Sequence, residues 1–259
     1  MKLSAVILSK GENTTQKAVD SVSFADEVVV ILDKSEKNNF HLEGEVKIVK
    51  HNLLNNFSQQ RNFGASQASG DWLLFLDADE TISSELQAEI VSAISGQNSV
   101  VSNLKTDSRL LTTHTDAYRL KRRDFFWGRE LKFGETKTAR DIGFIRLVKK
   151  NSGVWKGSIH EQYVTEHATS TLKGFIDHYP HQSISEFLAS INEYSTIRSK
   201  ELRDRNERFS VLKLVFYPVG KFVYTYVLKC GFLDGAAGFV YSFMMSFHSF
   251  LSRAKLLNL

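Results

Sequence analysis

The sequence predicts an α/β fold: a mostly parallel, doubly wound sheet, then a mixed region of strands, then a helical C-terminal segment. Short apolar runs alternate with helix-like stretches as far as Ile94, the pattern of a parallel sheet covered on both faces. Beyond Ser185 the spacing is helical to the end. The 259 residues suffice for one sizeable core, or for one core with a smaller appended part.

The first strand is predicted at Leu3–Leu8, a short apolar run that ends in a polar loop. Further strands are predicted at Glu27–Leu32, at the short run Val46–Val49 and at Trp72–Leu76. Apolar spacing and stop signals predict helices at Thr14–Ser23, Phe57–Ala68 and Ser83–Ile94. Because ligands of such sheets bind beyond the carboxyl ends of the strands, the loops with Glu12, Asp33 and the acids at 77–80 are expected to converge on one edge.

The second half of the chain begins with a polar, turn-rich stretch at Ser95–Thr115, which predicts a linker or an excursion. Strands of a mixed region are predicted at Asp116–Phe126, Ile142–Lys149 and Thr171–His178. We therefore expect a main domain over residues 1–180, with halves at 1–105 and 106–180, and a helical region over 181–259.

Composition excludes several classes of protein. A hydrophobic fraction of 42% and a charged fraction of 24% are ordinary for a soluble globular chain. The single cysteine, Cys230, excludes an internal disulfide and a thiolate zinc cluster, and it fits a reducing compartment. No signal peptide is predicted at the N-terminus. The net charge of +4 and pI near 9.0 permit an acidic partner without choosing one.

The quartet Asp77-Ala78-Asp79-Glu80 is the strongest chemical signal in the sequence. Two carboxylates at i and i+2 after a buried strand can reach one hard divalent cation, Mg²⁺ or Mn²⁺, which leaves positions open for substrate phosphates. In a purely structural alternative, Asp79 and Glu80 begin the following helix, where the dipole favours carboxylates.

A phosphatase of the haloacid dehalogenase type is a second chemical alternative. Leu73–Thr81 fits its hhhhDxDxT pattern, with Asp77 as nucleophile, Asp79 as general acid/base and Mg²⁺ as cofactor. However, that motif normally follows the first strand, and the later aspartates of this chain do not form the acidic pair that such a phosphatase needs. The phosphatase interpretation is therefore the weaker one.

The ordered set Val6–Glu12, Asp33-Lys34-Ser35, Gln60-Arg61-Asn62 and Leu76–Glu80 resembles an inverting glycosyltransferase of family 2 with the Rossmann-like GT-A fold. The particular motifs, QRN before GDWLLFLDADE and a later HE, are similar to those of bacterial lipopolysaccharide core β-1,4-glucosyltransferases. The resemblance covers the first 180 residues, and the tail GFLDGAAGF is also of a kind seen there. DxD alone is a weak signal, whereas the ordered set is strong.

The resemblance implies a nucleotide-sugar-binding half at 1–105 and an acceptor half at 106–180. It implies that Ser9 and Glu12 line the nucleoside pocket, that Asp33 approaches the base or ribose, and that Arg61 contacts the donor. It implies that Asp77 reaches the ribose or donor sugar and that Asp79, with Asp77, ligates Mg²⁺ or Mn²⁺. The surface alternatives are a solvated turn for Glu12, a strand-end cap for Asp33 and a solvated arginine for Arg61.

An inverting transfer needs a base for the acceptor hydroxyl. The ED pair and QxxRW segment that many family members use are missing in that form, so Glu161 is the predicted base and Asp141 the reserve. His160 would orient Glu161 or touch a phosphate, and Arg146 would meet acceptor phosphates. The alternatives are an exposed strand end for His160-Glu161 and an ordinary surface for Arg146.

The C-terminal third combines basic and aromatic residues. A basic stretch, Arg198–Arg208, precedes the aromatic-rich Phe209–Tyr226, and Phe239–Leu251 is apolar but shorter than the ~20 residues of a helical span. No confident transmembrane helix is therefore predicted. These helices are expected either to lie on an anionic membrane, or to pack on the core or a second subunit.

The function that follows is transfer of a sugar, with UDP-glucose as first donor candidate, to a lipopolysaccharide inner-core or other lipid-linked acceptor. The expected location is cytoplasmic, peripheral on the inner face of the bacterial inner membrane. A non-catalytic basic membrane-binding module is the alternative from another class. No helix-turn-helix, RRM or zinc pattern occurs, so no nucleic-acid partner is expected.

Overall fold

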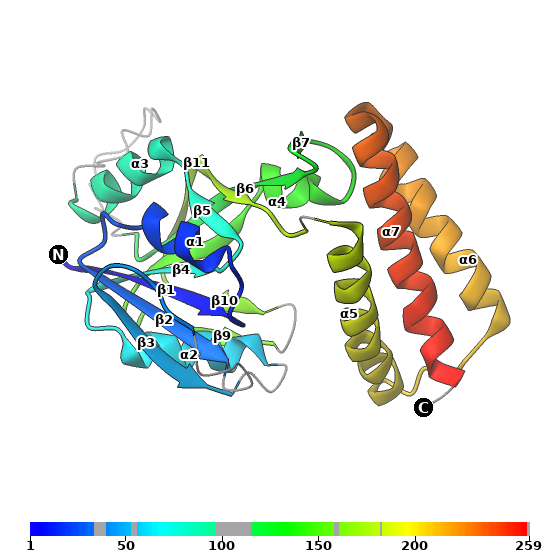
Figure 1. The fold of residues 1–259 in the computed structure, drawn as a ribbon, viewed down its shortest axis with the longest axis horizontal. Coiled ribbons are helices and arrows are strands. Elements are labelled where there is room, and N and C mark those ends of the chain that lie inside the picture. The colour runs from blue at the N-terminus through cyan, green and yellow to red at the C-terminus, as the bar shows by residue number, and fades with distance from the viewer. Residues whose placement is uncertain (34–39, 53–55, 97–114, 158–160, 182, 258–259) are drawn as a thin grey trace, which may run out of the picture. The chain divides into compact units, whose positions relative to one another are not determined.

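A computed structural model of the chain describes residues 1–33, 40–52, 56–96, 115–157, 161–181 and 183–257. The chain divides into two compact units (Figure 1): residues 1–122 with 142–178, and residues 123–141 with 179–259. The first unit holds the sheet, and the second holds the long C-terminal helices. Residues 123–141, which the sequence places in the acceptor half, thus group with the C-terminal helices.

The parallel part of the sheet runs in the order β3, β2, β1, β4. Strand β1 lies in the middle and pairs in parallel with β2 and β4, while β3 pairs in parallel with β2. The bounds are Leu3–Ser9 for β1, Glu27–Asp33 for β2, Val46–His51 for β3 and Trp72–Asp77 for β4. Because β1 is buried along its whole length, its sequence is a continuous apolar run rather than an alternating one.

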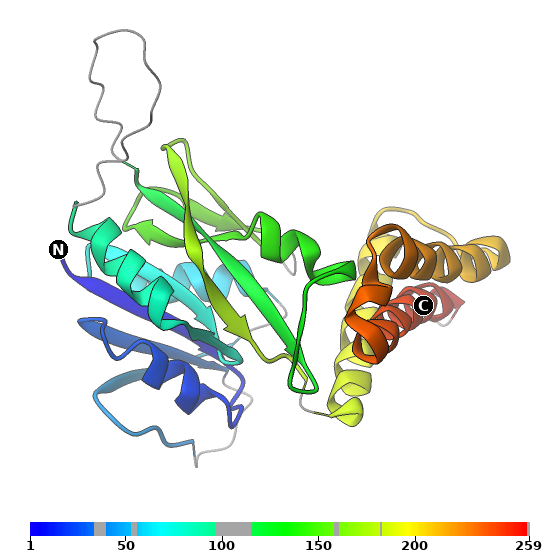
Figure 2. The same cartoon turned by 90° about the horizontal axis from the view of Figure 1, so that it is seen from above.

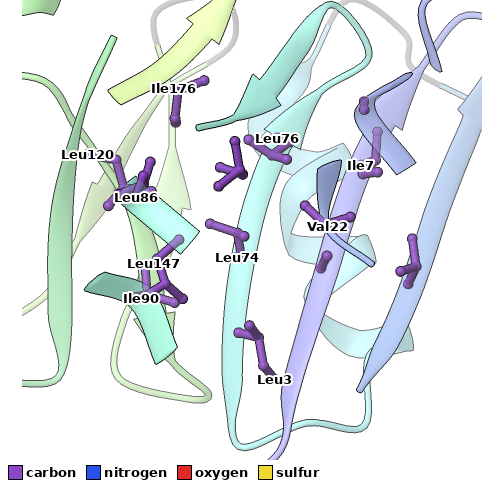
Figure 3. Close-up of a cluster of buried hydrophobic side chains, with 14 of the residues drawn as sticks. Leu3, Ile7, Val22, Leu74, Leu76, Leu86, Ile90, Leu120, Leu147 and Ile176 are labelled. Atoms are coloured by element: carbon purple, nitrogen blue, oxygen red, sulfur yellow. The ribbon is translucent and has the colours of Figure 1, made fainter. Parts of the chain in front are cut away.

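Helices cover both faces of this sheet, as predicted. Helices α1 (Thr15–Ser21) and α3 (Ser84–Ile94) pack on one face, where Ile7, Leu74 and Leu86 belong to one buried cluster (Figure 3). Helix α2 (Phe57–Gln67) covers the other face, which carries Val6 and Phe75. A Cβ at Gly64 of α2 would lie 2.5 Å from a methyl carbon of Val6, so only glycine permits this close approach to β1.

The mixed part of the sheet continues from β4 through antiparallel β8 and β6 to β11, with β5 beyond β11. The long strands β6 and β11 run side by side (Figure 2). The bounds are Glu80–Ile82 for β5, Ala117–Phe126 for β6, Phe144–Lys149 for β8 and Thr169–His178 for β11. A separate antiparallel pair joins β9 (Val154–Lys156) to β10 (Gln162–Val164).

The structural alternative for the acidic quartet, that Asp79 and Glu80 begin the following helix, is wrong. Glu80 does not begin the following helix but starts β5, which pairs with the end of β11. Helix α3 begins later, at Ser84, where the Ser83 hydroxyl accepts the backbone N–H of Leu86 at 3.3 Å. The acids are therefore held in a turn between two strands.

In the second unit, α7 lies between α5 and α6 (Figure 1). The chain first passes through β7 (Arg129–Leu131), the 3₁₀ turn η1 (Gly134–Thr136) and α4 (Lys137–Asp141). After residue 179 come α5 (Ile184–Asp204), α6 (Val211–Phe222), the π-helical η2 (Val223–Leu228), η3 (Gly231–Asp234), α7 (Gly235–Ala254) and η4 (Lys255–Leu257). The core of this unit includes Phe126, Phe187 and Met244.

The segment GFLDGAAGF connects different parts of the second unit through hydrogen bonds and close packing. The Asp234 carboxylate accepts the backbone N–H of Lys132 at 3.1 Å and of Phe133 at 2.9 Å. A Cβ at Gly238 would overlap the carbonyl oxygen of Gly231, so small residues let α7 approach η3 closely.

Candidate active site

The site is built around Asp77, the last residue of β4, which faces two buried arginines. Nη2 of Arg61 lies 2.7 Å from one carboxylate oxygen, and Nη2 of Arg146 lies 3.0 Å from the other. The exposed fractions of the two arginine side chains are only 1% and 7%. Burial alone would raise the pKa of Asp77, but Arg61 and Arg146 hold it well below its usual range. Asp77 is therefore a carboxylate at neutral pH.

Helix α2 positions Arg61 through its two neighbours. Gln60 is held at the end of β3, where its amide nitrogen donates to the carbonyl of His51 at 3.1 Å. Asn62 makes a reciprocal pair of 3.0 Å hydrogen bonds with the backbone of Trp155 in β9. The Asn56 side chain caps the helix by accepting the N–H of Gln59 at 3.1 Å. The first and third residues of QRN thus fix the helix, and the second reaches the site.

Glu161 lies within this network, as the sequence suggested for a residue of the site. Its Oε1 accepts from Nε of Arg61 at 2.9 Å, and 12% of its side chain is exposed. The Arg61 guanidinium also lies 4.9 Å from the centre of the Trp155 ring, close enough for a cation–π contact. Arg61 therefore joins Asp77 to Glu161. His160 lies outside the described residues.

Glu80 is fully buried beneath the turn that carries Asp77 and Asp79. Its Oε2 accepts the backbone N–H of Asp77 at 3.0 Å, which closes the turn. Its Oε1 lies 3.5 Å from Arg122 and 3.7 Å from Arg146. Burial opposes the charge on Arg146, but Glu80 and Asp77 raise its pKa above the ordinary value. Glu80 thus holds the acidic turn and the arginine in fixed relation.

Asp79 faces His178, the last residue of β11. A carboxylate oxygen of Asp79 lies 3.3 Å from Nε2 of His178, and the two side chains are 30% and 13% exposed. Burial alone would raise the pKa of Asp79, and the neighbouring His178 lowers it below its usual value. The pairing of β11 with β5 sets His178 opposite Glu80, which brings its ring beside Asp79.

Asp79 and His178 fit a divalent cation better than Asp77 does. A carboxylate oxygen and an imidazole nitrogen are normal ligands of Mn²⁺, and a metal that also binds a diphosphate needs few protein ligands. Both oxygens of Asp77 instead accept from arginines. Among the described residues, no group of three or more His, Cys, Asp or Glu side chains is arranged to hold a metal by itself.

Ser9 and Glu12 form a closed turn after β1. The Ser9 hydroxyl donates to Glu12 at 2.9 Å, and the backbone N–H of Lys10 donates to the same Glu12 oxygen at 2.7 Å. Gly11, with φ of 84°, allows the tight turn between them. Asp33 lies at the end of β2, half-buried and in register with His51 of β3. All three residues lie at the carboxyl ends of the parallel strands, as predicted.

Several buried nitrogens of the site have no hydrogen-bond partner among the described residues. They include Nη1 of Arg61 and Nη1 of Arg146. A buried N–H without a partner costs free energy, so such groups normally meet a ligand or water. Guanidinium N–H groups match phosphate and carboxylate oxygens. The site is therefore equipped to receive an anionic group.

No motif in the sequence predicts His178, Arg122 or Trp155 as residues of the site. His178 ends a strand that the sequence predicted, and this position at a strand end was the available signal. Asp141, the reserve base, ends α4 in the second unit, with its carboxylate 3.1 Å from Lys137.

Known proteins are similar to this chain over most of its length. The model of the family "Glycosyl transferase family 2" matches residues 4–152. An uncharacterised glycosyltransferase of Rickettsia typhi is 28% identical, over 100% of this chain and 87% of the relative. The lipopolysaccharide core biosynthesis glycosyltransferase LpsC of Rhizobium meliloti is 23% identical, over 77% of this chain and 68% of the relative.

Among solved structures, the mannosyltransferase PcManGT of Pyrobaculum calidifontis, in complex with GDP-Man and Mn²⁺, is similar with a TM-score of 0.50 and 11% identity. The match covers 99% of this chain and 87% of that one. This likeness concerns the fold, which is the GT-A type that the sequence predicted. Because the family model matches more than half of the chain, this protein belongs to glycosyltransferase family 2.

Proposed function

We propose that this glycosyltransferase moves a hexose, with glucose as first candidate, from a UDP-sugar to a lipopolysaccharide inner-core or other lipid-linked acceptor. The observation that carries the donor site is the pair of buried arginines on Asp77, each with a spare N–H. The similarity to LpsC supports a lipopolysaccharide-core acceptor. We place the enzyme in the cytoplasm, at the inner face of the bacterial inner membrane, where such acceptors are made.

In this proposal the sugar is transferred with inversion. The acceptor hydroxyl attacks the anomeric carbon on the face opposite the diphosphate, and Glu161 takes its proton. The bond from the anomeric carbon to the diphosphate oxygen breaks, and the electron pair leaves with UDP. Arg61 holds Glu161 in place and shares its charge with Asp77, which faces the ribose or the donor sugar.

The other residues of the site are assigned to the two substrates and to the metal. Ser9, Glu12 and Asp33 lie at the strand ends and are assigned to the nucleoside, while Arg146 is assigned to phosphate oxygens. Asp79 and His178 are assigned to Mg²⁺ or Mn²⁺, which when bound would neutralise charge on the leaving diphosphate. The presence of Mn²⁺ and GDP-Man in PcManGT is consistent with a metal and a nucleotide-sugar donor.

The phosphatase alternative loses its support. A nucleophilic aspartate needs an accessible oxygen, whereas both oxygens of Asp77 accept from arginines and the motif follows the fourth strand of the sheet. The chain also belongs to a family of transferases. A non-catalytic membrane-binding module is disfavoured for the same reason.

The test is release of nucleoside diphosphate from a panel of sugar donors with a heptose-containing acceptor and Mn²⁺ or Mg²⁺. We expect UDP release that requires the acceptor, and an anomeric proton coupling in the product that reports inversion. Release of GDP only, from GDP-sugars, would contradict the proposed donor. Retention of configuration would contradict the role of Glu161 as base.

A further inference from the structure

The helical stretch formed by α6 and η2 carries its apolar side chains on the outside. No residue of α6 is buried, although its sequence is strongly apolar. All residues from 211 to 228 are described, and every exposed one is aliphatic, aromatic or glycine. The most exposed are Leu212 and Leu228, each 69% exposed, and Phe216, 65% exposed. This is the reverse of a helix on a water-soluble protein, whose apolar side faces inward.

The charged groups of this stretch have partners within the same unit. The ammonium of Lys213 lies 2.9 Å from Glu207, and that of Lys221 lies 2.8 Å from Glu135. The hydroxyl of Thr225, which is fully buried, donates to the carbonyl of Lys221 at 2.9 Å. Charges that are paired, together with side chains that are apolar outward, match an environment without water.

The neighbouring helix extends the same surface. Phe239 and Phe243 of α7 are 47% and 54% exposed, whereas Ala237, Gly238 and Ser242 face inward. Packing through small residues, with large apolar ones outside, is typical of helices in lipid. We call the exposed apolar side chains of this region the α6–α7 face; it consists of Val211, Leu212, Val215, Phe216, Tyr217, Val219, Val223, Tyr224, Val227, Leu228, Phe232, Leu233, Phe239 and Phe243.

Basic residues lie at the start of this face. Arg203, Arg205 and Arg208 are exposed just before α6 and outnumber the exposed Asp204 among them, and the chain as a whole has a net charge of +4. This charge complements anionic headgroups and repels a second copy of the same chain. We infer that the α6–α7 face is a membrane-docking surface that inserts into one leaflet of an anionic bilayer.

The same contacts argue against a helix that crosses the bilayer. Val211–Leu228 is long and apolar enough to span a membrane by length and composition. However, Lys221 in its middle is paired with Glu135, and the backbone N–H of Gly134 donates to the carbonyl of Lys229 at 3.0 Å, just beyond its end. Crossing would carry Lys221 to the bilayer centre or break these bonds. The helix therefore lies along the membrane plane.

Vesicle sedimentation tests this inference without any donor or acceptor, so its outcome is separate from that of the proposed reaction. Wild-type protein is mixed with phosphatidylcholine vesicles, with and without phosphatidylglycerol. The test variant is Leu212→Glu with Phe216→Glu. The matched control, Ile48→Glu with Val91→Glu, adds the same charge at two exposed apolar positions of the first unit. Circular dichroism checks that both variants are folded.

We expect the test variant to lose about tenfold or more of its vesicle binding, and the control to keep wild-type binding. Replacing Arg203, Arg205 and Arg208 by Gln should remove the preference for phosphatidylglycerol. Equal binding by test and control variants would overturn the inference. So would a wild-type dimer that Leu212→Glu with Phe216→Glu makes monomeric, if the wild type does not bind vesicles. Resistance to carbonate extraction would overturn the in-plane placement.

Discussion

Arg61 donates a 2.7 Å hydrogen bond to Asp77 while 1% of its own side chain is exposed. A guanidinium so enclosed is stable only while a carboxylate compensates its charge, and removing one partner of a buried pair costs about 3–5 kcal/mol. Asp77 is itself partly exposed, so the lower part of that range applies to it. The pair therefore links the stability of the first unit to the donor site.

Asp77→Asn is expected to lower both stability and activity. It leaves Arg61 and Arg146 facing each other without a carboxylate between them. We expect a loss of about 3 kcal/mol in urea unfolding and a fall in kcat/KM of about 100-fold or more. Arg61→Lys keeps the positive charge but loses the forked guanidinium that contacts both Asp77 and Glu161. This variant should therefore unfold at a higher urea concentration than Asp77→Asn and still lose activity. Wild-type stability in Asp77→Asn would contradict this account.

Glu161→Gln is expected to lose kcat and keep donor binding. A general base contributes about 10²–10⁴-fold, and Gln can still accept from Arg61. Donor binding is measured by thermal shift and kcat by acceptor-dependent UDP release. Asp141→Asn is the control, since that residue is paired with Lys137 in the second unit. If Asp141→Asn lost kcat and Glu161→Gln did not, the roles of the two residues would be exchanged.

Asp79→Ala and His178→Ala are expected to abolish the effect of metal on donor binding. A ligand that binds only the folded state raises the unfolding temperature. We expect Mn²⁺ with UDP to stabilise the wild type more than UDP alone, and this difference to vanish in both variants. His167→Ala is the matched control, because that histidine is exposed and paired with Asp116 instead. A metal effect that persists in both site variants would contradict the assignment of Asp79 and His178 to the metal.

Glu27→Gln is expected to destabilise the protein in a pH-dependent way. Burial raises the pKa of Glu27, but hydrogen bonds from Ser4 and Ser69 lower it below its usual value. A lowered pKa in the folded state stabilises above the unfolded pKa of about 4.3, and this stabilisation is lost as the pH falls through the folded value. The variant should be less stable by about 1–2 kcal/mol at neutral pH and similar to wild type in acid.

Urea unfolding followed by tryptophan fluorescence measures this difference, since Trp72 and Trp155 both lie in the first unit. Glu43→Gln, at an exposed position, is the control and should show no such dependence. A difference that grew as the pH fell would show that the sign is wrong.

Gly238→Ala is expected to disrupt the second unit, whereas Gly220→Ala should not. A Cβ at position 238 would overlap the carbonyl oxygen of Gly231, while one at position 220 meets nothing within 4 Å. We expect Gly238→Ala to cost about 1–3 kcal/mol by overpacking. Gly220→Ala should be neutral or slightly stabilising, because it restricts the unfolded chain. Differential scanning calorimetry compares the two, and equal unfolding temperatures would contradict the close approach of α7 to η3.

The parallel core could be predicted from the sequence because both faces of β1 and β4 are buried, which makes their sequences continuous apolar runs. Strand β5 could not, since three residues that begin with Glu80 form a strand only by pairing with β11. The same pairing creates the contact between Asp79 and His178. The local sequence around Glu80 gives no indication of a pairing strand that lies almost 100 residues later in the chain.

The helical end of the chain shows a further limit. Lys213, Pro218 and Lys221 interrupt the apolar pattern of Phe209–Tyr226, and the sequence predicted no confident transmembrane helix there. In the structure the helix continues through Pro218 and ends in the π-helical η2. The two lysines are tolerated because Glu207 and Glu135 reach them.

The contact between Arg61 and Glu161 joins residues 100 positions apart, and that between Arg146 and Asp77 joins residues 69 apart. A chain emerging from the ribosome therefore completes its parallel strands well before it can complete its site. Contacts of such long sequence separation form slowly, because the closure of the intervening loop must come first. A nascent chain that stops before β11 would hold both arginines and their carboxylates, but it would leave Asp79 without His178 and β5 without its pairing strand. Nucleotide binding by this protein should thus appear late in synthesis, once His178 has left the exit tunnel.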